Sequence, residues 1–544
     1  MLGWSLSAAL LLIVLWQVPL WAAATTPAAD KTDVRVLIDI SGSMKQNDPE
    51  NLRRPALRLL VGLLPKNTRA GVWTFGQYVN MQIPLGAVDR AWKERARVSS
   101  RKIASPGQFT NIEDALKRAT EDWSSPTSGY SRSVVLLTDG MVDISKNGAK
   151  NRDSRQRILE QILPQLRKSD VTLHTVALSK NADHELMRKL AESTGGWYEQ
   201  VEDASQLQKV FLRIFEKVGR PDAVPLKDNK FTIDASITEA TVLVFHNPGA
   251  EPTQLIPPGA KPFGAEQAPK SVSWHRDEGY DMLTISDPQP GEWRIRAAVD
   301  PDNRVMVVTD LKMQTNQVPN QLIQGQSLPF EVSFTDHGRL IRKPAFLKVV
   351  DISAVLRDEH GDSEPRPLLD DGAGDDALAG DGIFSVEFHG ESLPGGLGEL
   401  IVNVLAPTFE REKRLTYEVV PPVDLEITPS GGDGRLHLVL TPDQRLVDTA
   451  SVATEVWLED LAGQRSLVPL IGGADGMSQG ELDITSFSGR RKVIVKATAK
   501  ALSGESLEYQ DSPAEVEGIM PPHIEEPVSR GQDAQEPPPA AMPE

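Results

Sequence analysis

The chain of 544 residues contains no cysteine. It therefore has neither a disulfide framework nor a cysteine that could carry a lipid anchor. Extracellular eukaryotic proteins often depend on disulfides, so an exported chain without them fits a bacterial envelope compartment better.

Long apolar runs are also absent, except at the amino end. Residues 1–24 carry no charged side chain, contain the run Ala8-Ala9-Leu10-Leu11-Leu12-Ile13-Val14-Leu15-Trp16 and end in Ala22-Ala23-Ala24. This pattern is typical of a secretory signal cleaved after Ala24. A retained membrane anchor is the alternative, because the run is nearly long enough to span a bilayer. No later segment reaches the roughly 18 apolar residues of a second span, so we expect an exported chain in the periplasm or cell envelope, without a membrane span after cleavage.

Motifs of common enzymes are missing or incomplete. There is no phosphate-binding loop of the G-x-x-x-x-G-K-[ST] type. His184-Glu185 begins like a zinc-protease helix, but Arg188 occupies the second histidine position. Gly476-Met477-Ser478-Gln479-Gly480 matches a nucleophile elbow in a region without the required strand, turn and helix. We therefore expect no enzyme and keep a hydrolase only as a remote alternative.

The charge is unevenly distributed along the chain. The net charge is -18, yet residues 33–218 carry more Lys and Arg than Asp and Glu, and residues 219–544 carry the opposite excess. An acidic majority argues against nucleic acid as the main partner. A basic amino-terminal region would attract acidic proteins.

Residues 33–218 alternate strand and helix patterns, which predicts a doubly wound α/β domain. Two leucine-rich sets with helical spacing should face its core: Leu57, Leu60, Leu63, Leu64 and Leu207, Val210, Phe211, Ile214. Strands are expected at 70–75, 133–138, 171–177 and 196–200, and helices at 55–64, 112–123, 154–168, 184–193 and 204–218.

After Gly219-Arg220-Pro221 the pattern becomes β-rich with Pro, Gly and Asp clusters and without a convincing helix. We expect two or three β-sandwich domains, at 227–311, 318–420 (immunoglobulin-like in size) and 421–517. Trp293 should be a core residue. The proline-rich acidic segment 518–544 cannot bury enough apolar surface to fold and is predicted to be a disordered tail.

Short polar residues follow the first apolar strand pattern. Val34-Arg35-Val36-Leu37-Ile38 runs directly into Asp39-Ile40-Ser41-Gly42-Ser43, at the strand end where open α/β sheets bind ligands. Oxygen donors without thiolate or imidazole favour Mg²⁺, with Mn²⁺ or Ca²⁺ as alternatives. A turn built from Asp, Ser and Gly is the simpler alternative.

The Asp-x-Ser-x-Ser motif resembles the metal-ion-dependent adhesion site of von Willebrand factor type A domains. In that family a Thr and an Asp from two later loops complete the site, and Thr110 and Asp139 occur in the expected order. The resemblance implies that Ser41 and Ser43 bind the metal directly and that Thr110 does so in one state. Asp39 and Asp139 would act directly or through waters.

A second acidic segment, residues 370–382, concentrates aspartates among glycines. It resembles Asp/Gly loops of bacterial immunoglobulin-like domains and could hold a second Ca²⁺ at Asp370, Asp371, Asp375 and Asp381. A turn-rich hairpin loop is the alternative.

Together these patterns predict metal-dependent protein–protein interaction, in which the cation binds an Asp or Glu of a partner. An acidic residue of the β-domains could also occupy the cation within the same chain. A metal-independent structural scaffold of the envelope is the alternative function.

Overall fold

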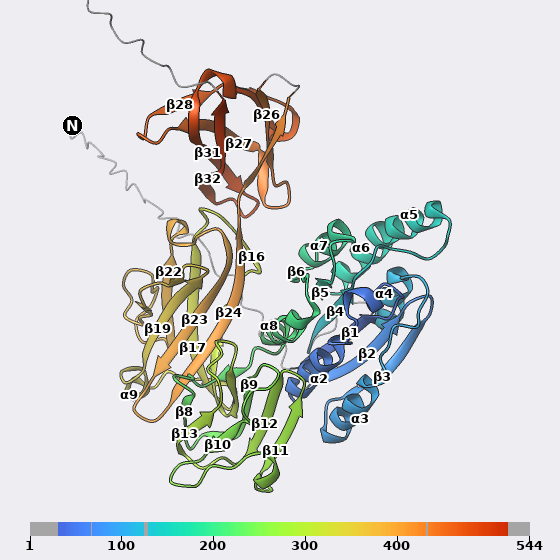
Figure 1. Ribbon diagram of the computed structural model, residues 1–544. Helices are drawn as coiled ribbons and strands as arrows, with labels where there is room; N and C mark the ends of the chain where they lie inside the picture. The colour runs from blue at the N-terminus through green and yellow to red at the C-terminus, as the bar shows by residue number, and fades with distance from the viewer. Residues whose placement is uncertain (1–30, 67, 124–128, 431–433, 520–544) are drawn as a thin grey trace, which may run out of the picture.

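The computed structural model describes residues 31–66, 68–123, 129–430 and 434–519. The expected signal segment and the expected tail lie outside these ranges, apart from residues 518 and 519. Figure 1 shows the α/β region beside a series of β-rich regions. We call residues 31–219 the head.

A six-stranded sheet forms the centre of the head, in the order β3-β2-β1-β4-β5-β6. Only β3 runs antiparallel to its neighbour. The strands are β1 Lys31–Asp39, β2 Thr68–Phe75, β3 Val79–Ala87, β4 Tyr130–Thr138, β5 Val171–Ala177 and β6 Tyr198–Gln200.

Helices cover both faces of this sheet (Figure 1). They are α1 Met44–Asn47, α2 Arg53–Leu63, α3 Arg90–Ser100, α4 Ile112–Thr120, α5 Gly148–Arg157, a π-helical turn η1 Ile158–Ile162, α6 Leu163–Lys168, α7 His184–Glu192, a 3₁₀ turn η2 Ala204–Gln206 and α8 Leu207–Gly219. Side chains of β1 alternate between the faces: Val36 and Ile38 pack with α2 and α8, whereas Leu37 packs with α4, α6 and α7. The expected doubly wound sheet is confirmed.

Some local predictions differ from the structure. The expected helix 154–168 begins earlier, at Gly148, and contains the π-helical turn. Strand β3 and helix α3 were not expected, because each buries few side chains; α3 buries only Trp92, Ala96 and Ser100.

Beyond the head, the described residues form almost entirely antiparallel strands, with only short helical turns between them: α9 Pro344–Leu347, η3 Ala265–Gln267, η4 Gly390–Ser392, η5 Ala474–Gly476 and η6 Ile484–Ser486. The strands up to residue 420 are β7 Asp222–Ala223, β8 Lys230–Ile233, β9 Ile237–Phe245, β10 Gln254–Ile256, β11 Val272–Asp277, β12 Tyr280–Ser286, β13 Gly291–Arg296, β14 Arg304–Thr309, β15 Leu311–Thr315, β16 Gln321–Ile323, β17 Leu328–Asp336, β18 Arg339–Leu340, β19 Asp351–Asp358, β20 Gly361–Asp362, β21 Arg366–Pro367, β22 Ile383–Phe388, β23 Gly396–Leu405 and β24 Glu410–Val420.

The last β-rich region forms two four-stranded sheets, β25-β26-β30-β29 and β28-β27-β31-β32. Its strands are β25 Val423–Pro429, β26 Arg435–Pro442, β27 Val447–Glu459, β28 Arg465–Val468, β29 Leu470–Gly472, β30 Ser478–Asp483, β31 Ser488–Ala501 and β32 Ser506–Ile519.

Among the described residues, four buried apolar clusters lie within the β-rich part, in keeping with its layered, sandwich-like character. Trp293 is buried and stacks on Phe231, which confirms it as a core residue. One 11-stranded sheet crosses the expected boundary between 227–311 and 318–420, because the short strand β7 pairs with both β14 and β24. In the described part of the chain, no helix has the length and hydropathy needed to cross a bilayer.

The head docks on the first β-rich region through α2 and α8. Leu243, Phe245, Tyr280 and Met306, all from β9, β12 and β14, belong to the same buried apolar cluster as the residues of α2 and α8. The head and this β-region therefore share a core.

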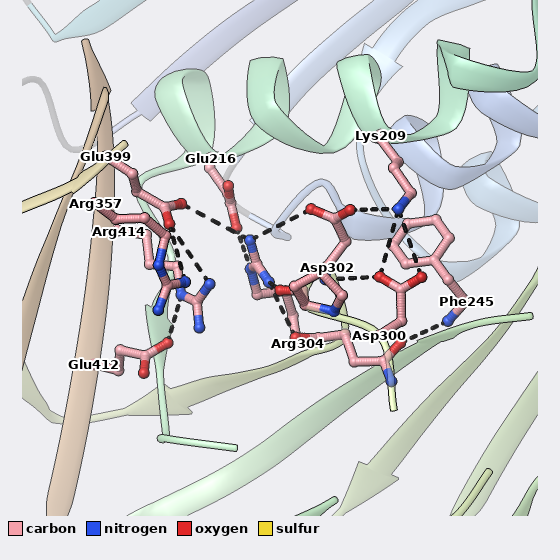
Figure 2. Close-up of polar contacts among 12 residues, drawn as sticks. Lys209, Glu216, Phe245, Asp300, Asp302, Arg304, Arg357, Glu399, Glu412 and Arg414 are labelled. Atoms are coloured by element: carbon pink, nitrogen blue, oxygen red, sulfur yellow. Dashed lines mark hydrogen bonds and ion pairs between the residues drawn. The ribbon is translucent and has the colours of Figure 1, made fainter. Parts of the chain in front are cut away.

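Charged side chains surround this shared core. The carboxylate of Glu216 on α8 accepts a hydrogen bond from Arg304 Nε at 2.9 Å, and both side chains are buried (Figure 2). Nearer the start of α8, Lys209 lies 2.6 Å from Asp302 (Figure 2). On the α2 side, Arg58 forms an ion pair with Asp277, and the two side chains are 10% and 8% exposed. Residues of the first β-rich region thus bind α8 both near its start, at Lys209, and near its end, at Glu216.

Candidate metal centre

Three loops of the head contribute to the centre: the first follows β1, the second precedes α4 and the third follows β4. The first loop begins at Asp39, where β1 ends. This carboxylate is fully buried, and its Oδ1 accepts a hydrogen bond from the backbone N–H of Ser41 at 2.7 Å. Its other oxygen accepts one from the hydroxyl of Thr138, the last residue of β4. These two donors fix the orientation of Asp39 at the edge of the sheet.

The third loop brings Asp139 from the neighbouring strand β4 to the same point. The hydroxyl of Ser43 donates to Asp139 Oδ1 at 2.9 Å, and that of Ser41 lies 3.5 Å from the same oxygen. The two serine hydroxyls are 3.1 Å apart. Asp39, Ser41, Ser43 and Asp139 therefore converge, as the order of the motifs predicted.

The second loop places Thr110 beside the third. Thr110 and Asp143 exchange backbone hydrogen bonds of 2.6 and 3.1 Å. A Cβ added at Gly140 would lie only 3.3 Å from the Thr110 hydroxyl oxygen, so the glycine permits this close approach. That hydroxyl has no hydrogen-bond partner among the residues that the structure describes, which leaves it available to a ligand.

Backbone strain occurs next to Thr110. Phe109 has φ +62°, a conformation that bulky side chains rarely adopt. The loop is held in place at Gly107, whose N–H donates to Ile40 O at 2.9 Å; a Cβ there would approach the same oxygen to 2.7 Å. Strain of this kind collects at functional sites.

Two carboxylates are buried together here. Burial, followed by the repulsion of Asp139, raises the pKa of Asp39 to about 7, against the opposing hydrogen bonds from Thr138 and Ser41. Both side chains are almost inaccessible, so their mutual repulsion is poorly screened by water. A divalent cation between these loops would offset that repulsion.

The donor set suits a hard cation. It offers carboxylate and hydroxyl oxygens only, and Ser43 is exposed to solvent although the other four candidate ligands are buried. Mg²⁺ retains several waters when protein ligands are few, so a position would remain for an outside oxygen. The residues therefore fit the metal that the resemblance implied.

Several residues that support this centre were not identified from the sequence. Asn47 donates from its side-chain amide to Asp139 Oδ2 at 2.9 Å, and Ser179 donates from its hydroxyl to the Asp139 carbonyl at 2.6 Å. The buried Arg53 joins the first two loops, because it pairs with Asp48 and donates to Ser105 Oγ at 2.7 Å. The only sequence signal was the spacing of Asn47, one helical turn after Ser43.

The second acidic segment gathers a different set of carboxylates from the one expected. Oxygens of Asp370, Asp376 and Asp381 lie within 4.8 Å of one another. Asp371 instead accepts from the N–H of Ala373, and Asp375 from that of Glu387. The Asp370 oxygens also accept backbone N–H groups of residues 380–382, so the loop is closed by its own amides. Calcium binding here stays a prediction.

The remaining sequence candidates have structural partners. Ser478 opens strand β30, and its hydroxyl accepts a hydrogen bond from Thr454 at 2.9 Å. His184 begins α7 and lies 2.7 Å from the Tyr198 hydroxyl. A cavity of about 960 Å³ lies in the β-rich part, near α9 and β19, and none of the five predicted metal ligands lines it.

Comparisons with known proteins relate the head to a known family. The family model described as "von Willebrand factor type A domain" matches residues 33–213. Calcium-activated chloride channel regulator 1 of Macaca mulatta is 22% identical over 380 residues, which cover 65% of this chain and 39% of that protein. The chain thus spans less than half the length of this relative.

Two solved structures resemble parts of the chain. A von Willebrand factor type A protein from Catenulispora acidiphila is 13% identical, with a TM-score of 0.29, and the match covers 57% of this chain and 64% of that one. Proximal thread matrix protein 1 from the mussel byssus, "with zinc occupied MIDAS motif", is 18% identical, with a TM-score of 0.27, and the match covers 34% of this chain and 47% of that one.

Proposed function

Residues 33–213 form a von Willebrand factor type A domain, and from this premise we propose that the protein binds a partner protein through a divalent cation held at the loop edge of the head. Domains of this family generally mediate protein–protein interactions, some of them with a metal. The convergence of Asp39, Ser41, Ser43 and Asp139, with Thr110 beside them, is the observation that carries the proposal.

Each residue has a distinct part in this proposal. Ser41, Ser43 and Asp139 would hold the cation, and Asp39 would contribute negative charge at the base of the site. Thr110 would offer a hydroxyl that has no competing hydrogen bond from any described residue. When bound, the cation supplies a strong, directional contact to a carboxylate oxygen. The exposed Ser43 marks the side from which that oxygen would approach.

The partner would present an Asp or Glu. The net positive charge of the head favours an acidic partner over a basic one. Within the described residues, the recorded hydrogen bonds of the five ligands all come from the head, so an acidic residue of the β-domains as an internal ligand stays a prediction. Magnesium is the first choice of ion, with manganese and calcium as alternatives.

The location that we propose is the bacterial periplasm or cell envelope. Its support is the apolar segment at residues 1–24 and the absence of cysteine from the sequence.

A metal-independent scaffold is the second candidate function. It is favoured by the core that the head shares with the β-rich part, since such docking fixes the head as a rigid element. A hydrolase has less support, because Ser478 opens a strand and does not occupy the strand–turn–helix elbow that its motif requires.

Asp139→Asn provides the direct test. The amide can accept from Asn47 and donate to Ser43, so the hydrogen bonds are kept while the charge is lost. We expect Mg²⁺ at a hundred times its Kd to stabilise the wild type by about 2.7 kcal/mol, and the variant not at all. Thermal unfolding in Mg²⁺ and in EDTA measures the shift of the wild type and of the variant. Partner capture under the same two conditions distinguishes metal-dependent binding from the scaffold function. A wild type without a Mg²⁺ shift refutes the metal site; capture that is equal in EDTA and for the variant favours the scaffold.

A further inference from the structure

Asn47 lies at the end of α1, four residues after Ser43. One helical turn therefore puts both side chains on the same side of the loop. Asn47 is half-buried, whereas the neighbouring Gln46 is exposed. Helix α1 therefore determines the position of the Asn47 side chain.

The two carboxylate oxygens of Asp139 have different hydrogen-bond partners. Nδ2 donates to Oδ2 at 2.9 Å, whereas Oδ1 faces the hydroxyls of Ser43 and Ser41. An ionised carboxylate only accepts hydrogen bonds, so the NH₂ end of Asn47 must face it. With Oδ2 engaged in this way, the Asp139 side chain is held with Oδ1 directed at the serines.

The backbone around Asn47 is anchored independently of its side chain. Met44 is fully buried, the N–H of Asn47 donates to Ser43 O at 3.2 Å, and the N–H of Asp48 donates to Met44 O at 3.0 Å. Asp48 in turn accepts from the N–H of Leu52 at 2.6 Å and pairs with Arg53. Removing the Asn47 side chain should therefore remove one hydrogen bond and leave the loop in place.

We propose that Asn47 is a positioning residue of the metal centre, which fixes Asp139 for the cation without binding the cation itself. This inference rests on the proposed function. Partners that orient a metal ligand typically change affinity by about 10- to 100-fold when they are lost. The neutral amide also matters, since an aspartate at this position would add a third carboxylate beside Asp39 and Asp139.

The test compares Mg²⁺ and Ca²⁺ titrations of the full-length wild type, Asn47→Ala, Asn47→Asp and the control Gln46→Ala. Titrations are made well below the unfolding midpoints, so that every variant is folded. We expect Asn47→Ala to bind Mg²⁺ about 10- to 100-fold more weakly, while its metal-free unfolding midpoint stays near that of Gln46→Ala. Asn47→Asp should shift the preference towards Ca²⁺, which accepts more carboxylate ligands than Mg²⁺ does.

The outcomes separate this inference from the function on which it rests. If the wild type binds neither ion, the metal centre itself is refuted. If the wild type binds Mg²⁺ and Asn47→Ala binds it equally well, only the role of Asn47 is refuted. A purely structural role would lower the metal-free midpoint of Asn47→Ala and leave the ratio of Mg²⁺ to Ca²⁺ affinity unchanged in both variants, and that result also overturns the inference.

Discussion

Two regions of the head differ in how their charges are balanced: the loop edge, where the candidate metal ligands meet, and the docked face, formed by α2 and α8. At the loop edge, two buried carboxylates, Asp39 and Asp139, lie together without a cationic side chain recorded in contact with either of them among the described residues. At the docked face, α2 and α8 bury apolar side chains against β9, β12 and β14, and the charges around them are paired. At the loop edge, repulsion between the two carboxylates remains for a ligand to offset, whereas at the docked face the charges already have partners. Binding and stability should therefore respond to different substitutions.

The largest effect is expected from Tyr280→Ala at the docked face. Tyr280 is fully buried in the shared core, and its hydroxyl lies 3.4 Å from the Pro55 carbonyl on α2. Loss of a buried aromatic ring costs about 4 kcal/mol, and thermal or denaturant unfolding would measure it. Tyr78→Ala is the matched control, since Tyr78 is 70% exposed and should change stability by less than about 0.5 kcal/mol. Equal effects of the two substitutions would show that the head does not depend on docking.

The second-largest effect is expected from Asp277→Ala, which leaves the largely buried Arg58 without its ion-pair partner. Such a loss costs about 3 kcal/mol, and the double variant Arg58→Met/Asp277→Leu should recover most of it. Burial raises the pKa of Asp277, but the hydrogen bonds and charge of Arg58, with His275, outweigh this and lower it.

The same pair gives docking a pH dependence. Because the pKa of Asp277 is lower in the folded protein, its contribution is fully present above the unfolded value of about 3.9 and declines as the pH falls below it. We expect the wild type to lose more stability than Asp277→Ala between neutral pH and pH values below about 4. Parallel acid unfolding curves for the two proteins would contradict this.

Thr110→Val should give a smaller effect, and on binding alone. The substitution removes a hydroxyl that has no hydrogen-bond partner in the described part of the chain and keeps the side-chain shape. We expect Mg²⁺ affinity to fall about tenfold, equivalent to about 1.4 kcal/mol, with an unchanged metal-free unfolding midpoint. Calorimetric titration with Mg²⁺ and thermal unfolding in EDTA measure the two quantities. A lower metal-free midpoint with unchanged affinity would place Thr110 among the stabilising residues instead.

The sequence predicted the sheet and the meeting of Asp39 and Asp139 at one edge well, because both follow from local order. A buried strand ending at Asp39, and another ending just before Asp139, must bring these side chains to one edge if the strands are parallel neighbours. Thr110 could be assigned only through the family resemblance, since nothing local marks it. Asn47 and Thr138 were missed because their roles depend on the partner that the fold provides.

The docked face was harder to predict for a different reason. The set Leu207, Val210, Phe211 and Ile214 was correctly expected to face a core. Leu212 and Phe215 are also buried, which widens the apolar surface of α8 beyond what one sheet requires. That excess is a sequence signal for a second packing partner, but it does not identify β9, β12 and β14 as that partner.

The smallest effect is expected from Lys66→Ala, at the rim of the docked face. Lys66 lies 3.2 Å from Glu239 on β9, but its side chain is 83% exposed and that of Glu239 is 28% exposed. Water and salt screen such a pair, and ordering a long lysine side chain costs entropy, so the loss should be less than about 1 kcal/mol. Thermal unfolding at low and at high salt provides the measurement, and the small difference from the wild type should vanish at high salt. A loss as large as that of Asp277→Ala would mean that Lys66 at the rim contributes to docking as much as the Arg58–Asp277 pair does. The contrast between exposed and largely buried ion pairs on this face would then fail.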